Sequence, residues 1–123
     1  MNNDGWRDSA HQAGKAIDRA LGAADPDAVV AQLSAANTAL DDALREAMAA
    51  AVLDGTSMRR VAEITGMAPN SVPPRLARSK SLSPYADEGS ITSQGIAVAR
   101  YDAASGRPPM TFKSRRKGPN DKS

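Results

Sequence analysis

The side chains of this chain that are most suited to binding chemistry are basic, and they lie between positions 59 and 80. They are Arg59, Arg60, Arg75, Arg78 and Lys80. Arginine and lysine donate charge-assisted hydrogen bonds to phosphate, and an arginine can also bind two acceptor atoms of a guanine at once. These residues therefore suit recognition of a polyanion better than the making or breaking of covalent bonds.

Residues for catalysis or metal binding are sparse. His11 is the single histidine, and the absence of cysteine excludes disulfides and thiolate metal sites. Asp41 and Asp42 are adjacent, so on a helix they point to different sides and suit solvation better than paired acid–base catalysis. No Gly-x-x-x-x-Gly-Lys phosphate loop occurs. We therefore expect no enzyme activity, no metal and no cofactor.

Charge is distributed unevenly along the 123 residues. Residues 1–55 hold nine acidic and four basic side chains, whereas residues 56–123 hold five acidic and twelve basic ones. A basic half joined to an acidic half favours an anionic partner, most often nucleic acid. The alternative is a solvated tail that merely carries surplus lysine and arginine.

No membrane or export signal is visible in the sequence. No apolar run approaches the roughly 18 residues that are needed to span a bilayer. The first residues also lack the basic-then-apolar order of a secretory signal. We expect a cytoplasmic, nucleoid-associated protein with no membrane partner.

Two helices are predicted in the N-terminal half, over residues 5–23 and 26–53. Asp25 is placed to cap the second helix, Pro26 suits its first position, and Gly55 is a stop signal. The apolar positions of the first helix are Trp6, Ala10, Ala13, Ile17, Ala20 and Leu21. Those of the second are Val30, Leu33, Leu40, Leu44, Met48, Ala51 and Val52. The helical spacing of both sets predicts an antiparallel hairpin over residues 1–55.

The apolar surface of the long helix has two interpretations. It can form a core within one chain, or part of it can join two copies in a homodimer. The chain has only four Trp, Tyr and Phe residues, so a core of alanine, valine and leucine buries little area per residue. This composition favours the homodimer.

A specific pattern of small and apolar residues follows in "GTSMRRVAEITGMAPNSVPPRLARSK", residues 55–80. Ser57 is a good N-cap for a short helix that contains Val61, Ala62 and Ile64. Ala62 is small enough for a second helix to cross close above it, and Gly66, four residues later, can take the positive φ of a tight turn. The predicted core between the two helices consists of Ile64, Met67, Val72 and Leu76.

This stretch resembles the helix-turn-helix family, and most closely the region 4 of sigma factors and related bacterial regulators. The resemblance covers about residues 55–80. It implies a second helix docked in the major groove of double-stranded DNA, with sequence-specific binding. The role implied is transcriptional regulation in a bacterium, plasmid or phage. The alternative is a sigma-like interaction module that binds RNA polymerase or another protein and contacts DNA weakly.

Two prolines stand where the second helix of the motif is expected. Proline in a helix interior costs about 3 kcal/mol, but the first four amides of a helix have no intrahelical partner. With Asn70 or Ser71 as the cap, Pro73 and Pro74 fall in the first turn, although Val72 before them is disfavoured in α geometry. The sequence therefore predicts a second helix that begins at about 71–73 and runs to about 80.

The expected DNA contacts follow from this placement. The predicted base contacts are Asn70, Ser71, Pro74 and Arg75, with the proline limited to apolar contact such as a thymine methyl. The predicted phosphate contacts in the motif are Arg59, Arg60, Arg78 and Lys80.

The C-terminal third is predicted to lie outside the helical part. Residues 82–95 are rich in serine and glycine and are typical of a linker. Residues 96–112 alternate in a way that indicates either a β-hairpin, as a wing beside the motif, or a mobile segment. Residues 113–123 are expected to be a disordered basic tail whose phosphate contacts are Lys113, Arg115, Arg116 and Lys117. The predicted fold is thus mainly α, with a flexible or wing-like extension.

Overall fold

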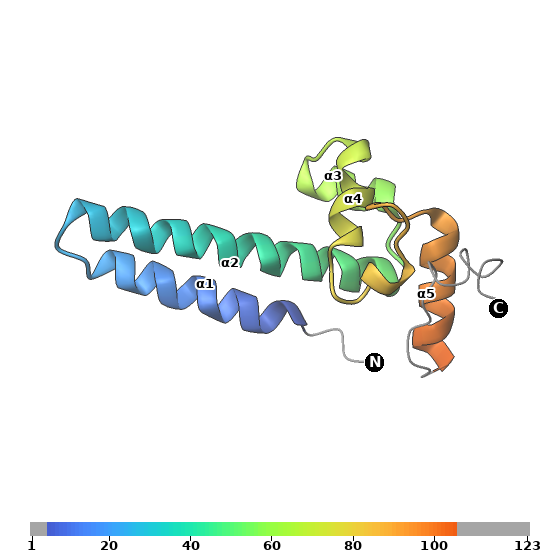
Figure 1. The fold of residues 1–123 in the computed structure, drawn as a ribbon, viewed down its shortest axis with the longest axis horizontal. Helices are drawn as coiled ribbons and strands as arrows, with labels where there is room; N and C mark the ends of the chain where they lie inside the picture. The colour runs from blue at the N-terminus through green and yellow to red at the C-terminus, as the bar shows by residue number, and fades with distance from the viewer. Residues whose placement is uncertain (1–4, 106–123) are drawn as a thin grey trace. The chain divides into compact units, whose positions relative to one another are not determined.

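The computed structural model describes residues 5–105, and this part of the chain is mainly helical, as predicted. Its α-helices are α1 (Gly5–Leu21), α2 (Pro26–Leu53), α3 (Met58–Thr65), α4 (Val72–Ala77) and α5 (Ser93–Ser105) (Figure 1). Two 3₁₀ turns, η1 (Pro69–Ser71) and η2 (Ser83–Tyr85), complete the described elements. The chain divides into two compact units, with the division between Ala47 and Met48.

The first unit is an antiparallel pair formed by α1 and most of α2 (Figure 1). Asp25 begins α2 as predicted, because its Oδ2 accepts a hydrogen bond from the Ala28 amide at 3.3 Å. Alanines fill the seam between the helices. The buried ones are Ala13, Ala16 and Ala20 of α1 and Ala36 and Ala43 of α2. Within this unit, the larger aliphatic side chains of the predicted stripes, such as Ile17, Leu33 and Leu40, lie on the surface instead.

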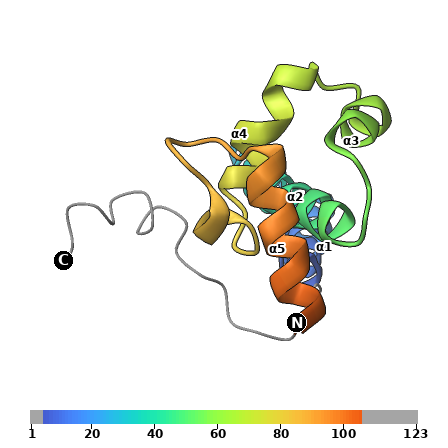
Figure 2. The same ribbon diagram turned by 90° about the vertical axis from the view of Figure 1, so that its right-hand side faces the viewer.

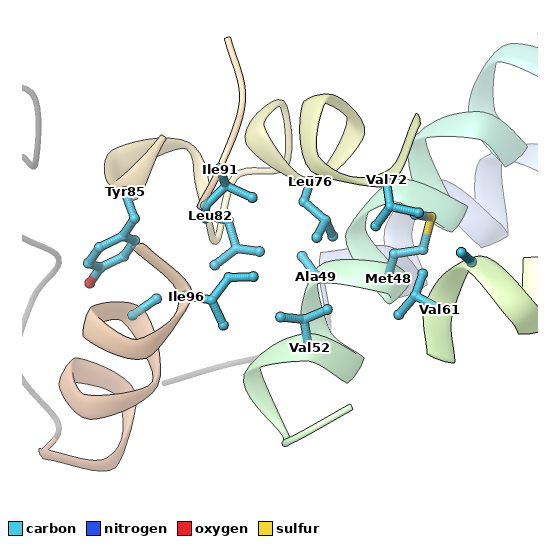
Figure 3. Packing of buried hydrophobic residues seen from close by; sticks show 12 residues of the cluster. Met48, Ala49, Val52, Val61, Val72, Leu76, Leu82, Tyr85, Ile91 and Ile96 are labelled. Carbon is cyan, nitrogen blue, oxygen red and sulfur yellow. The ribbon is translucent and has the colours of Figure 1, made fainter. Parts of the chain in front are cut away.

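The second unit is built around an apolar core to which the end of α2 contributes (Figure 3). Met48, Ala49 and Val52 of α2 belong to this core, so the hairpin unit ends before Gly55. The other members of the core are Val61, Ala62, Val72, Leu76, Leu82, Tyr85, Ile91, Ile96 and Ala99. Every described element from α3 onward supplies at least one core side chain except η1.

The first helix of the predicted motif and the turn after it are confirmed. Ser57 has extended φ and ψ angles, and its hydroxyl accepts a hydrogen bond from the Arg60 amide at 3.1 Å. Gly66 ends α3 with φ of 76°, the left-handed conformation that a residue with a Cβ rarely adopts. The turn is held further by Thr65, whose hydroxyl accepts from the Met67 amide at 3.2 Å.

The second helix begins where the sequence predicted but ends sooner. Pro73 and Pro74 lie in the first turn of α4, where their missing amides remove no helical hydrogen bond. Val72 adopts α geometry (φ −71°, ψ −50°) although it precedes a proline, because its side chain is completely buried in the core. α4 ends at Ala77 instead of about residue 80. The prediction that Ile64 belongs to the core is wrong, because 65% of its surface is exposed.

The interpretation of residues 82–95 as a linker is wrong. Leu82, Tyr85 and Ile91 are among the most buried side chains of the second unit. Ser79 turns the chain inward after α4: its hydroxyl donates to the Leu76 carbonyl at 2.7 Å and accepts from the Leu82 amide at 3.1 Å. The apolar residues of this segment are spaced irregularly, yet they supply a large share of the core.

The expected wing over residues 96–112 is also wrong for its described part, which lies in helix α5. Thr92 begins this helix by accepting a hydrogen bond from the Gly95 amide at 3.1 Å. Ile96, Ala99 and Asp102 recur at helical spacing and are buried. Figure 2 shows that α5 lies beside the end of α2. Residues 106–112 lie outside the described residues.

Close packing and one buried hydrogen bond hold α5 against η2. A Cβ atom added to Gly95 would lie 2.8 Å from the Tyr85 carbonyl oxygen, so only glycine allows this approach. At the other end of the contact, the Tyr85 hydroxyl donates to Oδ2 of the buried Asp102 at 2.8 Å. The bond satisfies two polar groups that burial would otherwise penalise.

Candidate nucleic-acid interface

The basic residues of α3 lie on its first turn and are exposed. Ser57 fixes this turn through the Arg60 amide, so the cap also sets the direction of the side chains that follow. The Arg60 guanidinium lies 3.3 Å from Glu63, an exposed ion pair that contributes little to stability. Arg59 makes no hydrogen bond or ion pair within the described part of the chain. No described residue therefore neutralises the charge of Arg59, whose side chain is exposed.

The turn between α3 and α4 presents Asn70 and Ser71 to solvent. Both are exposed residues of η1, and the Ser71 amide donates to the Ala68 carbonyl at 2.9 Å. Ser71 occupies the position before α4, but its side chain makes no capping hydrogen bond. Asn70 and Ser71 are thus both exposed immediately before α4. The sequence predicts base contacts at these two residues.

The two other predicted base contacts are less accessible. Pro74 and Arg75 are half-buried, and the Nε atom of Arg75 is completely buried. The aliphatic part of the Arg75 side chain therefore packs on the protein. Arg75 belongs to α4, which directly follows the exposed turn. Any base contact from this arginine has to come from the terminal part of its guanidinium group.

Arg78 and Lys80 lie in the turn after α4, since the helix ends at Ala77. Both side chains are exposed, and Ser79 between them is completely buried. The hydrogen bonds of the Ser79 hydroxyl fix the backbone of this turn. The turn thus carries two exposed basic residues, one before and one after the buried Ser79 in the sequence.

Residues 57–80 carry a net positive charge, and their exposed basic side chains, Arg59, Arg60, Arg78 and Lys80, are here called the cationic surface. This stretch contains five basic side chains and one acidic one, Glu63, which Arg60 pairs with. Together the exposed basic and amide groups of α3, η1 and the turn after α4 can donate hydrogen bonds to phosphate oxygens or base edges. The structure does not describe Lys113, Arg115, Arg116 and Lys117, which lie outside residues 5–105.

Other chemistry has little support in the described residues. No group of three His, Cys, Asp or Glu side chains within residues 5–105 is arranged to hold a metal ion. A hollow of about 160 Å³ between Ser57 and Arg100 is smaller than typical ligand pockets. A hollow of about 410 Å³ lies on α1 and is lined by residues that include Trp6, His11 and Asp18, so its size is within the range of ligand pockets. No helix of the described chain is long and apolar enough to cross a membrane.

The sequence interpretation missed the contribution of α5 to the shape of this site. Arg100 of α5 donates to the Val52 carbonyl at 2.9 Å and to the Thr56 carbonyl at 3.1 Å. These bonds hold the chain immediately before Ser57, the residue that caps α3. The signal that could have indicated α5 is Thr92, a suitable N-cap followed by an alanine-rich segment.

Comparisons with known proteins add no relative. No family model, no curated protein and no solved structure matches this chain.

Proposed function

We propose that residues 57–80 bind double-stranded DNA and that the protein regulates transcription in a bacterium, plasmid or phage. The observation that carries this proposal is the pair α3 and α4, joined through a left-handed Gly66 and edged by exposed basic and amide side chains. A short helix pair of this kind can present its second helix to the major groove. The excess of basic residues supplies the attraction to phosphate.

The contacts divide by position. Arg59, Arg60, Arg78 and Lys80 bind phosphates on either side of the groove, which fixes the register of the protein on the duplex. Asn70 and Ser71 reach base edges from the turn, because α4 is only six residues long and begins with a buried valine and two prolines. Pro74 offers apolar contact, and Arg75 contributes the terminal part of its guanidinium group.

A second candidate function is recognition of a protein such as RNA polymerase. The observation that favours it is the exposed Ile64 on α3, an apolar side chain one turn beyond Arg60. A single exposed aliphatic residue is common on protein surfaces, whereas interfaces bury contiguous apolar patches. The cationic surface is the more extensive feature, so DNA binding is the primary proposal.

Replacement of Arg75 by alanine tests specific recognition. The operator is first selected from a random duplex library, and binding is then measured to that operator and to each of its single-base variants. We expect Arg75→Ala to weaken operator binding by about 1–3 kcal/mol and to relax discrimination at one position, because a base contact is lost.

The matched control is Arg45→Ala, which removes an arginine that is ion-paired with Asp42 on the hairpin unit. Arg45→Ala should leave discrimination between bases unchanged. An equal loss for every sequence with Arg75→Ala would show that this arginine reads no base. Failure of the library to yield any preferred sequence would refute sequence-specific binding itself.

A further inference from the structure

The hairpin unit carries an apolar face that its own packing does not use. Its large aliphatic side chains are exposed while its alanines are buried. On α2 they are Val30, Leu33, Leu40 and Leu44, with exposed fractions of 68, 48, 56 and 38%. On α1 they are Ile17 and Leu21, with exposed fractions of 42 and 81%.

These side chains share one side of the hairpin. On both helices an exposed aliphatic follows a buried alanine by one residue, as Ile17 follows Ala16 and Leu44 follows Ala43. One residue is a rotation of about 100° in the same sense along each helix. α1 and α2 run in opposite directions and face each other through their buried alanines. Equal rotations away from these alanines therefore bring the aliphatic side chains of both helices to the same side of the hairpin. Arg19, one residue before Ala20, lies at the other side, where it donates to Gln32 at 3.3 Å.

The spacing on α2 is that of a second helix-packing seam. Val30, Leu33, Asn37, Leu40 and Leu44 follow one another at intervals of three and four residues. This is the heptad spacing with which helices pack side by side. A helix that uses two neighbouring seams, one for α1 and one left exposed, has the pattern of a member of a four-helix bundle.

We propose that a second copy of this chain covers the face, so that two hairpins form a four-helix bundle about a two-fold axis near Asn37. The seam is nearly symmetric about this residue, with leucines four positions before and three after it, and apolar residues seven positions away on both sides. An antiparallel copy of α2 therefore brings Leu33 against Leu40 and Val30 against Leu44 of the partner. A carboxamide both donates and accepts, so Asn37 can pair with its own copy.

The size of the face fits a reversible dimer. The seam extends over about 20–25 Å at 1.5 Å per residue, and two helices side by side are about 20 Å wide. Two copies therefore bury about 1,000 Å² in total, near the lower limit for a specific interface. The dimer is expected to dissociate on dilution, and its formation does not depend on DNA binding.

The first test measures the molar mass of the full chain by sedimentation equilibrium over a dilution series. We expect a concentration-dependent dimer. Leu40→Glu should raise the dissociation constant at least tenfold, since it places a charge in the apolar face. Ala35→Glu adds the same charge on the opposite side of the same helix and should leave the dimer unchanged. Leu40 is exposed, so both variants should keep the helicity of the wild type in circular dichroism.

The second test uses the absence of cysteine in the natural chain. Asn37→Cys should give an intermolecular disulfide on mild oxidation, and an equimolar mixture of Leu33→Cys and Leu40→Cys should give the mixed disulfide. Ala35→Cys should stay unlinked. A monomer at all concentrations, or a dimer that Leu40→Glu leaves intact, would overturn the proposal. Cross-linking through Ala35→Cys but not Asn37→Cys would place the interface on the wrong side and overturn it as well.

Discussion

Replacement of Leu76 by alanine is expected to lower the free energy of unfolding of the second unit by about 2–5 kcal/mol. Leu76 is completely buried and lies on α4 at the centre of the core formed with Val52 and Val72 (Figure 3). The loss combines the transfer free energy of the removed methyl groups with the cavity that they leave. Because most small domains are stable by only about 5–15 kcal/mol, the proposed DNA binding should decrease together with folding. The measurement is urea denaturation followed by circular dichroism.

Ile64→Ala is the matched control for this prediction. The sequence predicts that Ile64 and Leu76 belong to the same core. In the structure Ile64 is exposed and Leu76 is buried. The Ile64 variant should change the unfolding free energy by less than about 0.5 kcal/mol, as surface substitutions usually do. Equal destabilisation by the two variants would mean that Ile64 is buried after all and that α3 is oriented differently.

Arg100→Met is expected to destabilise the second unit by about 2–3 kcal/mol. The guanidinium group bonds the Val52 and Thr56 carbonyls, and hydrogen bonds to charged groups contribute about 1.5–3 kcal/mol. Methionine retains much of the apolar stem but leaves both carbonyl groups without this donor. The segment that precedes the cap of α3 should then exchange its amide hydrogens faster, which hydrogen exchange detects residue by residue.

Arg100→Lys separates the role of charge from that of geometry. Lysine keeps the positive charge near the end of α2 but cannot reproduce the planar fork that spans the two carbonyl groups. We expect it to recover only part of the lost stability. Full recovery with lysine would show that charge near the end of the helix is the main contribution, and an unaltered Arg100→Met protein would show that the two hydrogen bonds are unimportant.

The conformation of α3, of the turn after it and of the start of α4 could be predicted because its signals are local. A serine cap, a glycine at positive φ and prolines in a first turn each act within a few residues, so Ser57, Gly66 and Pro73 indicate their conformations directly. The exposure of Ile64 could not be predicted in this way. It depends on the angle at which α3 meets the core, and no residue of α3 encodes that angle by itself.

Residues 82–105 were misinterpreted because their core contacts are long-range. Leu82 and Ile91 are buried, yet they stand among serines and glycines without a helical or strand period. In α5 the alternation of Ile96 and Val98 is typical of a strand, while the helical face of Ile96, Ala99 and Asp102 includes a buried carboxyl group. That face could be recognised only with the knowledge that Tyr85 lies opposite Asp102.

In the hairpin, the sequence does not indicate which sides of the helices pack together. Both helices were predicted within about two residues of their observed ends, but the side of α2 that meets α1 was not. Two apolar seams run along α2, one with Ala36 and Ala43 and the other with Leu40 and Leu44. The second seam is displaced from the first by about one residue, as Leu44 directly follows Ala43. Periodicity alone therefore shows a wide stripe without indicating which half packs inside the chain.

The most direct test of DNA binding by the cationic surface is the salt dependence of affinity for a duplex of about 20 base pairs. Anisotropy of a labelled duplex is measured between about 50 and 200 mM salt for the wild type, for Arg59→Gln with Arg78→Gln, and for Arg7→Gln with Lys15→Gln. Both double variants lose two positive charges, but the second pair lies on α1.

We predict that log K for the wild type falls linearly with log salt and that the Arg59 and Arg78 variant has a slope shallower by about two, or about 0.9 for each lost phosphate contact. The α1 variant should keep the slope of the wild type. Absence of salt-dependent duplex binding by the wild type would contradict the proposed function. Equal losses in the two double variants would show that net charge, not the surface of α3 and the turn after α4, holds the DNA.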